Sequence, residues 1–342
     1  MTKQRIIISR APVRISFGGG GTDLPSFYER YGGLTVSTTI NHYVYAVFTP
    51  GGREAVQIIS ADYRTFWRQA QDDLIWNGDL ALPRAVLNEF GLRQGLDIFL
   101  ASQVPPGTGL GSSGSVAVCL IKGLAAWQER PIARAEMAEE ACRVEIEKMG
   151  MPVGKQDQYA AAFGGLNCIR YSADGVSVEP LLVPEATRQS LERRLMLFFT
   201  GSSRKSSSIL RYQKQKGEEG DQRVIERLLA IKELGVAIRH ALEGGDLDRF
   251  SELLHRSWVQ KRGLAPNISN DNINQVYQLA RSKGAIGGKI TGAGGGGFLL
   301  LYCNETHQKA VTEALEGVGL RRLAFAFDTA GAQIVCPDGS VW

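Results

Sequence analysis

The sequence predicts an α+β protein of two domains. Segments rich in β-branched and aromatic residues dominate the first part of the chain, and alternating helical and strand-like segments follow from residue 195 onward. A chain of 342 residues is long enough to bury two cores. A polar, charged stretch at 185–194 separates the two parts, so we place the domains at residues 1–188 and 189–342.

The first domain is expected to contain an antiparallel sheet followed by helices. Runs typical of strands occupy 6–8, 34–40, 43–48, 56–60 and 96–104. Apolar residues at helical spacing predict helices at 113–128 and 134–149, the second of which ends at Gly150 and Pro152. A strand pair at 167–171 and 176–182 closes this domain.

The second domain is expected to form an α+β layer. Strands are predicted at 195–199, on both sides of a glycine loop across 287–302, and at 322–327. Helices are predicted at 222–243, 247–260, 272–283 and 305–316. No internal repeat of 20 to 50 residues interrupts this alternation.

Composition argues against several classes of partner. The net charge of +4 is small and no run of lysine or arginine is long enough for a nucleic-acid site. No apolar run approaches the ~20 residues that span a bilayer, and Ile6–Ile8 is too short for the core of a signal peptide. We therefore expect a cytoplasmic protein without nucleic-acid or membrane partners, and we assign no oligomeric state.

Cysteine and histidine show no metal-binding pattern. The five cysteines are scattered without a C-x-x-C pair and are interpreted as small buried apolar residues. The four histidines also lack metal-ligand spacing and are interpreted as structural.

Three glycine-rich stretches carry the strongest functional signal. They are Ser16–Asp23, Pro105–Gly114 and Thr291–Gly297. Glycine is costly inside helices and strands, so such runs are typical of places where the backbone needs positive φ or must approach a ligand closely. Two or more of these runs meeting in the fold would suit a phosphate-rich ligand.

The middle stretch satisfies G-x-G-x-x-G over Gly109–Gly114, which is a weak signal alone. A dinucleotide fold would place the first glycine directly after the strand, but Pro105–Thr108 intervene. The H-R-D and D-F-G motifs of protein kinases and the Walker A motif do not occur. What remains is a loop whose free N–H groups at a helix start face an anion, or a plain turn capped by Ser112 or Ser113.

The chain resembles the GHMP kinases, the family of galactokinase, homoserine kinase and mevalonate kinase, because the three stretches match the three motifs of that family in the same order. The matching motifs are Arg10–Ser16 running into Thr22 and Asp23, Pro106–Ser115, and Lys289–Gly297. The resemblance implies a ribosomal-protein-like N-terminal domain, a ferredoxin-like C-terminal domain, and the cofactors ATP and Mg²⁺. It implies that the second motif binds ATP through Pro106, Gly107, Gly109, Leu110, Gly111, Ser112, Ser113 and Gly114, and that the third forms a wall of the site.

Within the family, Gly154–Gly165 resembles the branch that phosphorylates the anomeric hydroxyl of sugars. This branch implies a small-molecule sugar or sugar phosphate as partner, with D-glycero-D-manno-heptose 7-phosphate as the nearest match. Where galactokinase has Gly-Glu-His-Thr-Asp, this chain has Gly19-Gly20-Gly21-Thr22-Asp23, which argues against galactose. Alternatives are another sugar 1-kinase of the L-fucose or N-acetylhexosamine type, and a non-catalytic sugar and ATP sensor.

The resemblance implies catalytic roles for Asp157 and Arg14. Asp157 would accept the proton of the anomeric hydroxyl, and Arg14 would keep that carboxylate ionised and stabilise the incoming oxygen. An alternative for Asp157 is a cap on the helix that starts near Gln158.

For Mg²⁺ the resemblance implies a serine of the second motif and a glutamate preceding Asp157. Ser113 and Glu145 are favoured, because Mg²⁺ prefers hard oxygen ligands and needs only one or two protein groups. Glu147 lies two residues further on the opposite side of the same predicted helix, and Ser112 neighbours Ser113, so each remains an alternative.

The predicted sugar-binding residues come from the first and third motifs, from Gly154–Gly165 and from the segment 204–205. Asp23 is expected to accept hydrogen bonds from sugar hydroxyls, with a turn residue as the alternative. The other residues expected to contact the substrate are Gly20, Gly21, Thr22, Tyr159, Gly294 and Gly295. A second phosphate on the sugar would need a cation, for which Arg204, Lys205 and Lys289 are candidates that could equally contact ATP or water.

Overall fold

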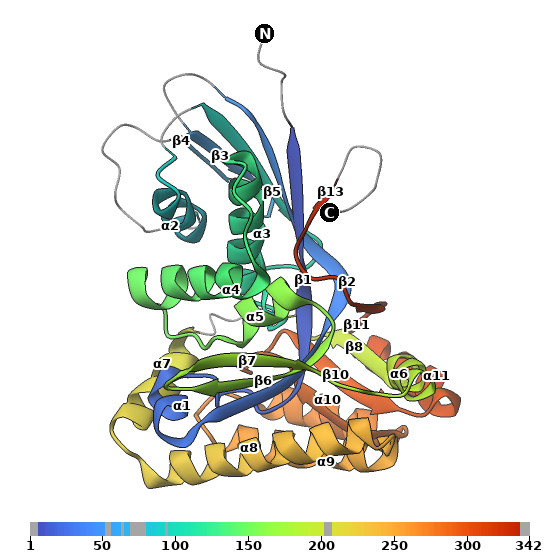
Figure 1. Ribbon diagram of the computed structural model, residues 1–342. Helices are drawn as coiled ribbons and strands as arrows, with labels where there is room; N and C mark the ends of the chain where they lie inside the picture. The colour runs from blue at the N-terminus through green and yellow to red at the C-terminus, as the bar shows by residue number, and fades with distance from the viewer. Residues whose placement is uncertain are drawn as a thin grey trace.

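Two β-sheets and their covering helices make up the described part of the computed structural model, which comprises residues 6–51, 56–62, 65–68, 80–92, 95–201 and 207–335 (Figure 1). The first sheet has the strand order β13-β1-β2-β5-β3-β4, with β12 and the pair β6-β7 attached to β2. The second has the order β11-β8-β10-β9. This two-sheet architecture confirms the predicted α+β class.

The strands have the following bounds. The first sheet contains β1 (Ile7–Gly18), β2 (Gly33–Pro50), β3 (Val56–Ser60), β4 (Thr65–Arg68), β5 (Leu96–Ser102), β6 (Leu166–Ser172), β7 (Gly175–Pro180), β12 (Phe327–Asp328) and β13 (Gln333–Val335). The second contains β8 (Leu195–Phe199), β9 (Ala285–Ile290), β10 (Phe298–Cys303) and β11 (Arg321–Leu323). The strand predicted at 322–327 is divided between β11 and β12.

β2 is one long strand where the sequence predicts two. It pairs along its length with β1, and the register shifts at Pro12 and Val13, which lie opposite Tyr43 and Ile40. The two residues between, Asn41 and His42, form an irregularity that the partner strand accommodates. The backbone N–H of Asn41 donates instead to the carbonyl of Ala326, 2.9 Å away. The polar dipeptide therefore interrupts the pairing without ending the strand.

The helices of the first half pack on the first sheet and against one another (Figure 1). They are α1 (Pro25–Tyr31), α2 (Ala81–Glu89), α3 (Ser112–Trp127), α4 (Arg134–Cys142) and α5 (Gln156–Phe163). The helix predicted at 134–149 continues from α4 into a π-helical turn, η1 (Arg143–Lys148). Such turns change which side chains face inward and are frequent at functional sites.

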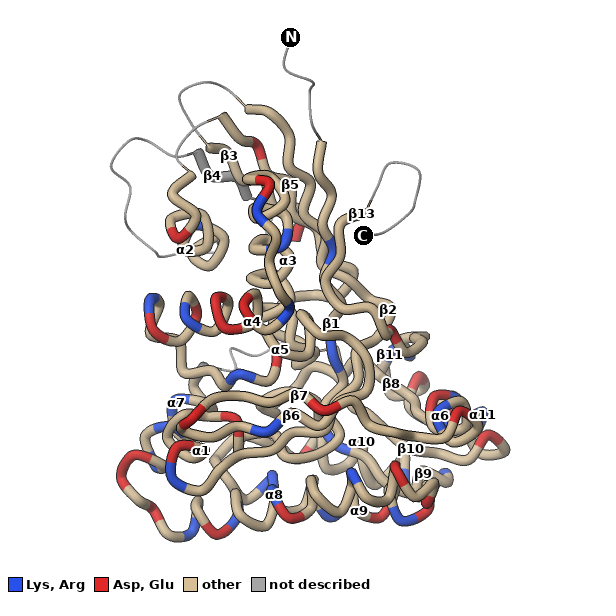
Figure 2. The backbone as a smooth tube through the Cα atoms, viewed as in Figure 1, with Lys and Arg blue, Asp and Glu red and all other residues tan. Residues whose placement is uncertain are grey.

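The helices of the second half are α6 (Glu185–Arg194), α7 (Ser207–Glu218), α8 (Gln222–Glu243), α9 (Leu247–Arg262), α10 (Asp271–Ser282) and α11 (Glu305–Gly317). The carboxylates of Asp221 and Asp246 cap α8 and α9, because each accepts a backbone N–H of the first turn, at 3.2 and 2.8 Å. Both signs of charge are interspersed along α8 and α9 (Figure 2). None of the described helices is long and apolar enough to cross a membrane.

A shared core joins the two sheets. The ring of Phe250 on α9 packs edge to face on Phe17 of β1 and on Tyr302 of β10, with centroids 5.4 and 5.8 Å apart. The last strands also return to the first sheet, because β12 pairs with β2 and β13 with β1. The division expected at residue 188 lies within α6, directly before the chain enters the second sheet.

Cysteine burial agrees with the sequence interpretation of these residues. Cys119, Cys142, Cys168 and Cys303 are buried free thiols, and Cys336 lies outside the described residues. Burial raises the pKa of the Cys119 thiol to about 12.

Replacing Phe250 with alanine tests the shared core. The side chain is fully buried, so its removal should lower the free energy of unfolding by about 3–5 kcal/mol. Urea denaturation followed by circular dichroism measures this loss. Val259, which is 41 % exposed on the same helix, provides the matched control, and Val259→Ala should change stability by less than about 0.5 kcal/mol. Equal losses in the two variants would contradict the packing described.

Candidate active site

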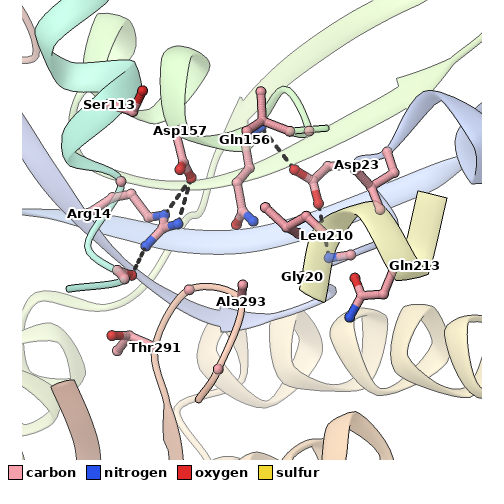
Figure 3. A pocket seen from close by; sticks show the side chains of 18 of the residues that line it. Arg14, Gly20, Asp23, Ser113, Gln156, Asp157, Leu210, Gln213, Thr291 and Ala293 are labelled. Carbon is pink, nitrogen blue, oxygen red and sulfur yellow. Dashed lines mark hydrogen bonds and ion pairs between the residues drawn. The ribbon is translucent and has the colours of Figure 1, made fainter. Parts of the chain in front are cut away.

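The three glycine-rich stretches converge on one pocket between the two sheets (Figure 3). Backbone from all three reaches the pocket, together with side chains from β1, α5, α7 and α9. The lining residues from the predicted motifs are Arg14, Gly20, Gly21, Asp23, Gly107, Gly109, Gly111, Ser112, Ser113, Gly154, Gln156, Asp157, Thr291, Gly292, Ala293, Gly294 and Gly296.

The second and third stretches touch backbone to backbone. A Cβ atom at Gly109 would lie 2.5 Å from the carbonyl oxygen of Thr291, and one at Gly292 would lie 2.4 Å from the Cα of Gly109. Both glycines have positive φ, 83° and 65°. Any other residue would therefore be strained and would push the loops apart. The middle loop is also tied to β1, because the N–H of Arg14 donates to the carbonyl of Leu110 at 2.9 Å.

Asp157 and Arg14 form an ion pair at the pocket. Arg14 donates from Nε and Nη2 to the same oxygen of Asp157, Oδ1, at 2.9 and 2.6 Å, and from Nη1 to the carbonyl of Gly109 at 2.5 Å. Within the described residues, Oδ2 of Asp157 has no hydrogen-bond partner. The Asp157 side chain is 29 % exposed, whereas Arg14 is 3 % exposed. The carboxylate thus pairs with Arg14 and does not cap α5, and one of its oxygens is available to a ligand.

Asp23 is a second carboxylate on the opposite side of the pocket from the middle loop. It accepts the N–H groups of Gly21 at 2.9 Å and of Gln156 at 3.2 Å. Burial raises its pKa, and the negative charge of Asp157 adds to that shift. The side chain of Gln156 points into the pocket, and its Oε1 is buried with no partner among the described residues (Figure 3). These groups can bind a polar ligand.

Ser113 and Glu145 are brought together by α3 and the π-helical turn η1. The Ser113 hydroxyl donates to Oε1 of Glu145, and Nε2 of Gln158 donates to Oε2 at 2.6 Å. Glu145 is 1 % exposed, and burial raises its pKa to about 7. Glu147 is exposed to solvent. Of the two alternative glutamates, only Glu145 therefore meets the serine of the middle loop.

The Ser113 and Glu145 pair fits a magnesium ion. A hydroxyl and a carboxylate are hard oxygen donors of the kind that Mg²⁺ prefers, and Mg²⁺ needs few protein ligands. Glu145 is a buried carboxylate with no cationic partner among the described residues, so a bound cation would compensate its charge. No group of three or more His, Cys, Asp or Glu side chains that could hold a metal ion occurs in the described residues.

Several predicted residues do not line the pocket. The Thr22 hydroxyl donates to the carbonyls of Gly19 and Leu34, and the Tyr159 hydroxyl donates to Glu139, so both side chains are used within the fold. Lys289 is 2 % exposed with its ammonium 3.5 Å from the carbonyl oxygen of Phe17. The other described residues of the predicted site that do not line the pocket are Pro106, Leu110, Gly114, Glu145 and Gly295. Arg204 and Lys205 fall outside the described residues.

Other lining residues lack any signal in the sequence. Leu210 and Gln213 come from α7, which the sequence does not predict, and Met151 and Val153 come from the loop before α5. Lys261 comes from the last turn of α9. A lysine at a helix C-terminus is usually exposed to solvent, where it interacts favourably with the helix dipole.

Comparison with known proteins places the chain in a family. Residues 80–165 match the model of the GHMP kinases N terminal domain, and residues 238–319 match that of the GHMP kinases C terminal domain. The chain is 32 % identical over 320 residues to D-glycero-alpha-D-manno-heptose 7-phosphate kinase of Campylobacter jejuni, covering 91 % of this chain and 93 % of that protein. Arabidopsis thaliana bifunctional fucokinase/GDP-fucose pyrophosphorylase is 26 % identical, covering 89 % of this chain and 30 % of that protein.

Solved structures of two sugar kinases are similar to this structure over nearly the whole chain. A D-glycero-D-manno-heptose 1-phosphate kinase from Bacteroides thetaiotaomicron superposes with a TM-score of 0.78 at 28 % identity, covering 95 % of this chain and 97 % of that one. Galactokinase of Lactococcus lactis has the same fold, with a TM-score of 0.78 at 17 % identity, covering 97 % of this chain and 95 % of that one. The chain therefore belongs to the GHMP kinase family, and it is a phosphotransferase that acts on an alcohol group.

Proposed function

We propose that this protein transfers the γ-phosphoryl group of ATP to the anomeric hydroxyl of D-glycero-D-manno-heptose 7-phosphate. The observation that carries the proposal is the Asp157–Arg14 pair, which has a free carboxylate oxygen in a pocket lined by all three glycine-rich stretches. The similarity to a heptose 7-phosphate kinase over 91 % of the chain supports the choice of sugar.

Asp157 would act as the base in the transfer. The sugar O–H bond breaks and its proton passes to Oδ2 of Asp157, while the sugar oxygen forms a bond to the γ-phosphorus and the bond from that phosphorus to the bridging oxygen of ADP breaks. Arg14 binds only Oδ1, so it can keep the carboxylate ionised without blocking Oδ2.

The middle loop would hold the nucleotide phosphates. Gly107, Gly109 and Gly111 expose backbone to the pocket, and α3 begins directly after them at Ser112. The free N–H groups and the dipole of a helix start attract phosphate. Ser113 and Glu145 would hold Mg²⁺, which would neutralise charge on the phosphate oxygens.

Asp23 would bind the sugar, together with Gln156. Asp23 is fixed by two backbone N–H groups and can accept hydrogen bonds from hydroxyls, and the amide of Gln156 faces the same space. Gly20 and Gly21 leave room beside them because they carry no side chain.

Gly154→Ala should disturb this sugar site. A Cβ atom at Gly154 would lie 2.0 Å from Oδ2 of Asp23, so the carboxylate must move. A displacement of about 1 Å can lower kcat/KM for the sugar by about 10²-fold, while the Kd of ATP should remain unchanged. Steady-state kinetics with the sugar varied measures the loss. Gly317→Ala is the control, because a Cβ there meets nothing within 4 Å.

The function is tested by incubating the protein with ATP, Mg²⁺ and a panel of acceptors. The panel contains the heptose 7-phosphate, the unphosphorylated heptose, L-fucose, galactose and N-acetylglucosamine. ADP release is measured, and ³¹P NMR locates the new phosphate. We expect the highest kcat/KM with the heptose 7-phosphate and phosphorylation at the anomeric position. A preference for L-fucose would assign the alternative sugar 1-kinase activity, and ATP and sugar binding without turnover would indicate a sensor.

A further inference from the structure

Lys261 is a buried cation in the wall of the pocket. The residue is 6 % exposed and lines the pocket from the last turn of α9. Its ammonium group donates to the carbonyl of Gly292, and among the described residues it forms no ion pair with a carboxylate. An ammonium group has three N–H donors, so this contact leaves donors available to a ligand.

The other cations at the site are committed elsewhere. Arg14 uses Nε and Nη2 on Asp157 and Nη1 on the carbonyl of Gly109. Lys289 does not line the pocket. Among the described lining residues, Lys261 is therefore the cation that has no carboxylate partner.

The charges around Lys261 indicate an anionic ligand. Burial, together with the positive charge of Arg14, lowers its pKa to about 8, against the opposing effects of Asp23 and Asp157. A buried charge without a counter-ion is costly unless a partner compensates it. Its present acceptor, Gly292, touches Gly109 of the phosphate-facing loop. The ammonium group thus lies where the second and third glycine-rich stretches meet.

We propose that Lys261 is a catalytic residue that binds a phosphoryl group at this junction, namely the γ-phosphoryl group of ATP during its transfer. The inference rests on the proposed function. Arg14 would stabilise the incoming sugar oxygen through its contact with Asp157, whereas Lys261 would neutralise the oxygens of the phosphoryl group itself.

The test compares two nucleotides in variants that remove the charge. Glutamine in Lys261→Gln can still donate to the Gly292 carbonyl, and Lys261→Met removes both charge and donor. Isothermal titration calorimetry with Mg²⁺ gives the Kd of AMP-PNP and of ADP. In Lys261→Gln we expect AMP-PNP to bind roughly 10- to 100-fold more weakly and ADP within twofold of wild type, because a charge-assisted hydrogen bond is lost only at the γ-position. Lys309→Gln, on an 87 % exposed lysine, should match the wild type for both nucleotides.

The alternatives give different results. Equal weakening of AMP-PNP and ADP, with a lower melting temperature, would make Lys261 a structural tether of the third loop and overturn the inference. Unchanged nucleotide binding with a higher KM for the heptose 7-phosphate, but not for the unphosphorylated heptose, would assign Lys261 to the sugar phosphate instead.

If the wild type binds AMP-PNP through Lys261 but phosphorylates no sugar, the proposed function fails and the contact stands. Normal AMP-PNP binding and normal kcat in Lys261→Gln would refute the contact alone.

Discussion

Asp157→Asn is expected to lower kcat by about 10²- to 10⁴-fold, the usual contribution of a general base. Asparagine can still accept the two hydrogen bonds of Arg14 through Oδ1, so the loop geometry should be retained. It places an NH₂ group at the position of Oδ2, where the proposed step needs an acceptor. Single-turnover kinetics with saturating ATP and heptose 7-phosphate measures the effect on chemistry, apart from product release.

The control for Asp157→Asn is Asp174→Asn, in the exposed turn between β6 and β7. It makes the same chemical change and should leave kcat within twofold of wild type. The Kd of AMP-PNP should be similar in both variants and the wild type, because Asp157 is not proposed to bind the nucleotide. Retention of full activity by Asp157→Asn would eliminate the base and leave positioning by the pocket as the source of catalysis.

The glycine loops could be predicted from the sequence because their requirement is local. Gly109 and Gly292 have positive φ, and their backbones lie so close together that neither position has room for a Cβ atom. Both requirements are met by glycine alone. The strands could be predicted for the same reason, since alternation and β-branching are properties of a short segment. One exception is β2, where the polar pair Asn41 and His42 indicates a break that the register shift against β1 absorbs.

Side chains placed by long-range packing could not be predicted. Lys261 looks like an ordinary cation at a helix C-terminus, and only the contact of α9 with the third glycine stretch makes it part of the pocket. Gln213 lies on α7, a helix of mostly polar residues that the sequence analysis does not predict. Conversely, Tyr159 belongs to a motif of the sugar kinases but its hydroxyl turns away from the pocket to Glu139. A motif predicts which backbone segments meet and does not predict every side-chain direction.

The choice between Glu145 and Glu147 also depended on the three-dimensional structure. In an ideal helix the two positions lie on different sides, and the helical spacing does not show which side faces Ser113. The chain at 143–148 is π-helical, and it buries Glu145 against Ser113 while Glu147 stays exposed. Substitution of Glu145, and not of Glu147, should therefore impair the binding of magnesium.

Glu145→Gln should raise the magnesium concentration needed for half-maximal activity by about 10- to 100-fold, in line with the loss expected when a group at a metal site is replaced. Glutamine keeps the size of the side chain and can still accept the Ser113 hydroxyl, but it is neutral and a much weaker ligand for Mg²⁺. Glu147→Gln removes the same charge two residues away on the exposed side and should behave as wild type.

A stability measurement separates magnesium binding from turnover in these two variants. A ligand that binds only the folded protein raises its melting temperature, so adding Mg²⁺ to the AMP-PNP complex should stabilise the wild type and Glu147→Gln. Glu145→Gln should lose most of this increase, yet without Mg²⁺ it should melt no lower than the wild type, because the substitution removes a buried carboxylate that has no cationic partner among the described residues. If Glu147→Gln lost the magnesium response and Glu145→Gln kept it, the ligand would have to be Glu147, and the buried carboxylate would serve only to hold Ser113.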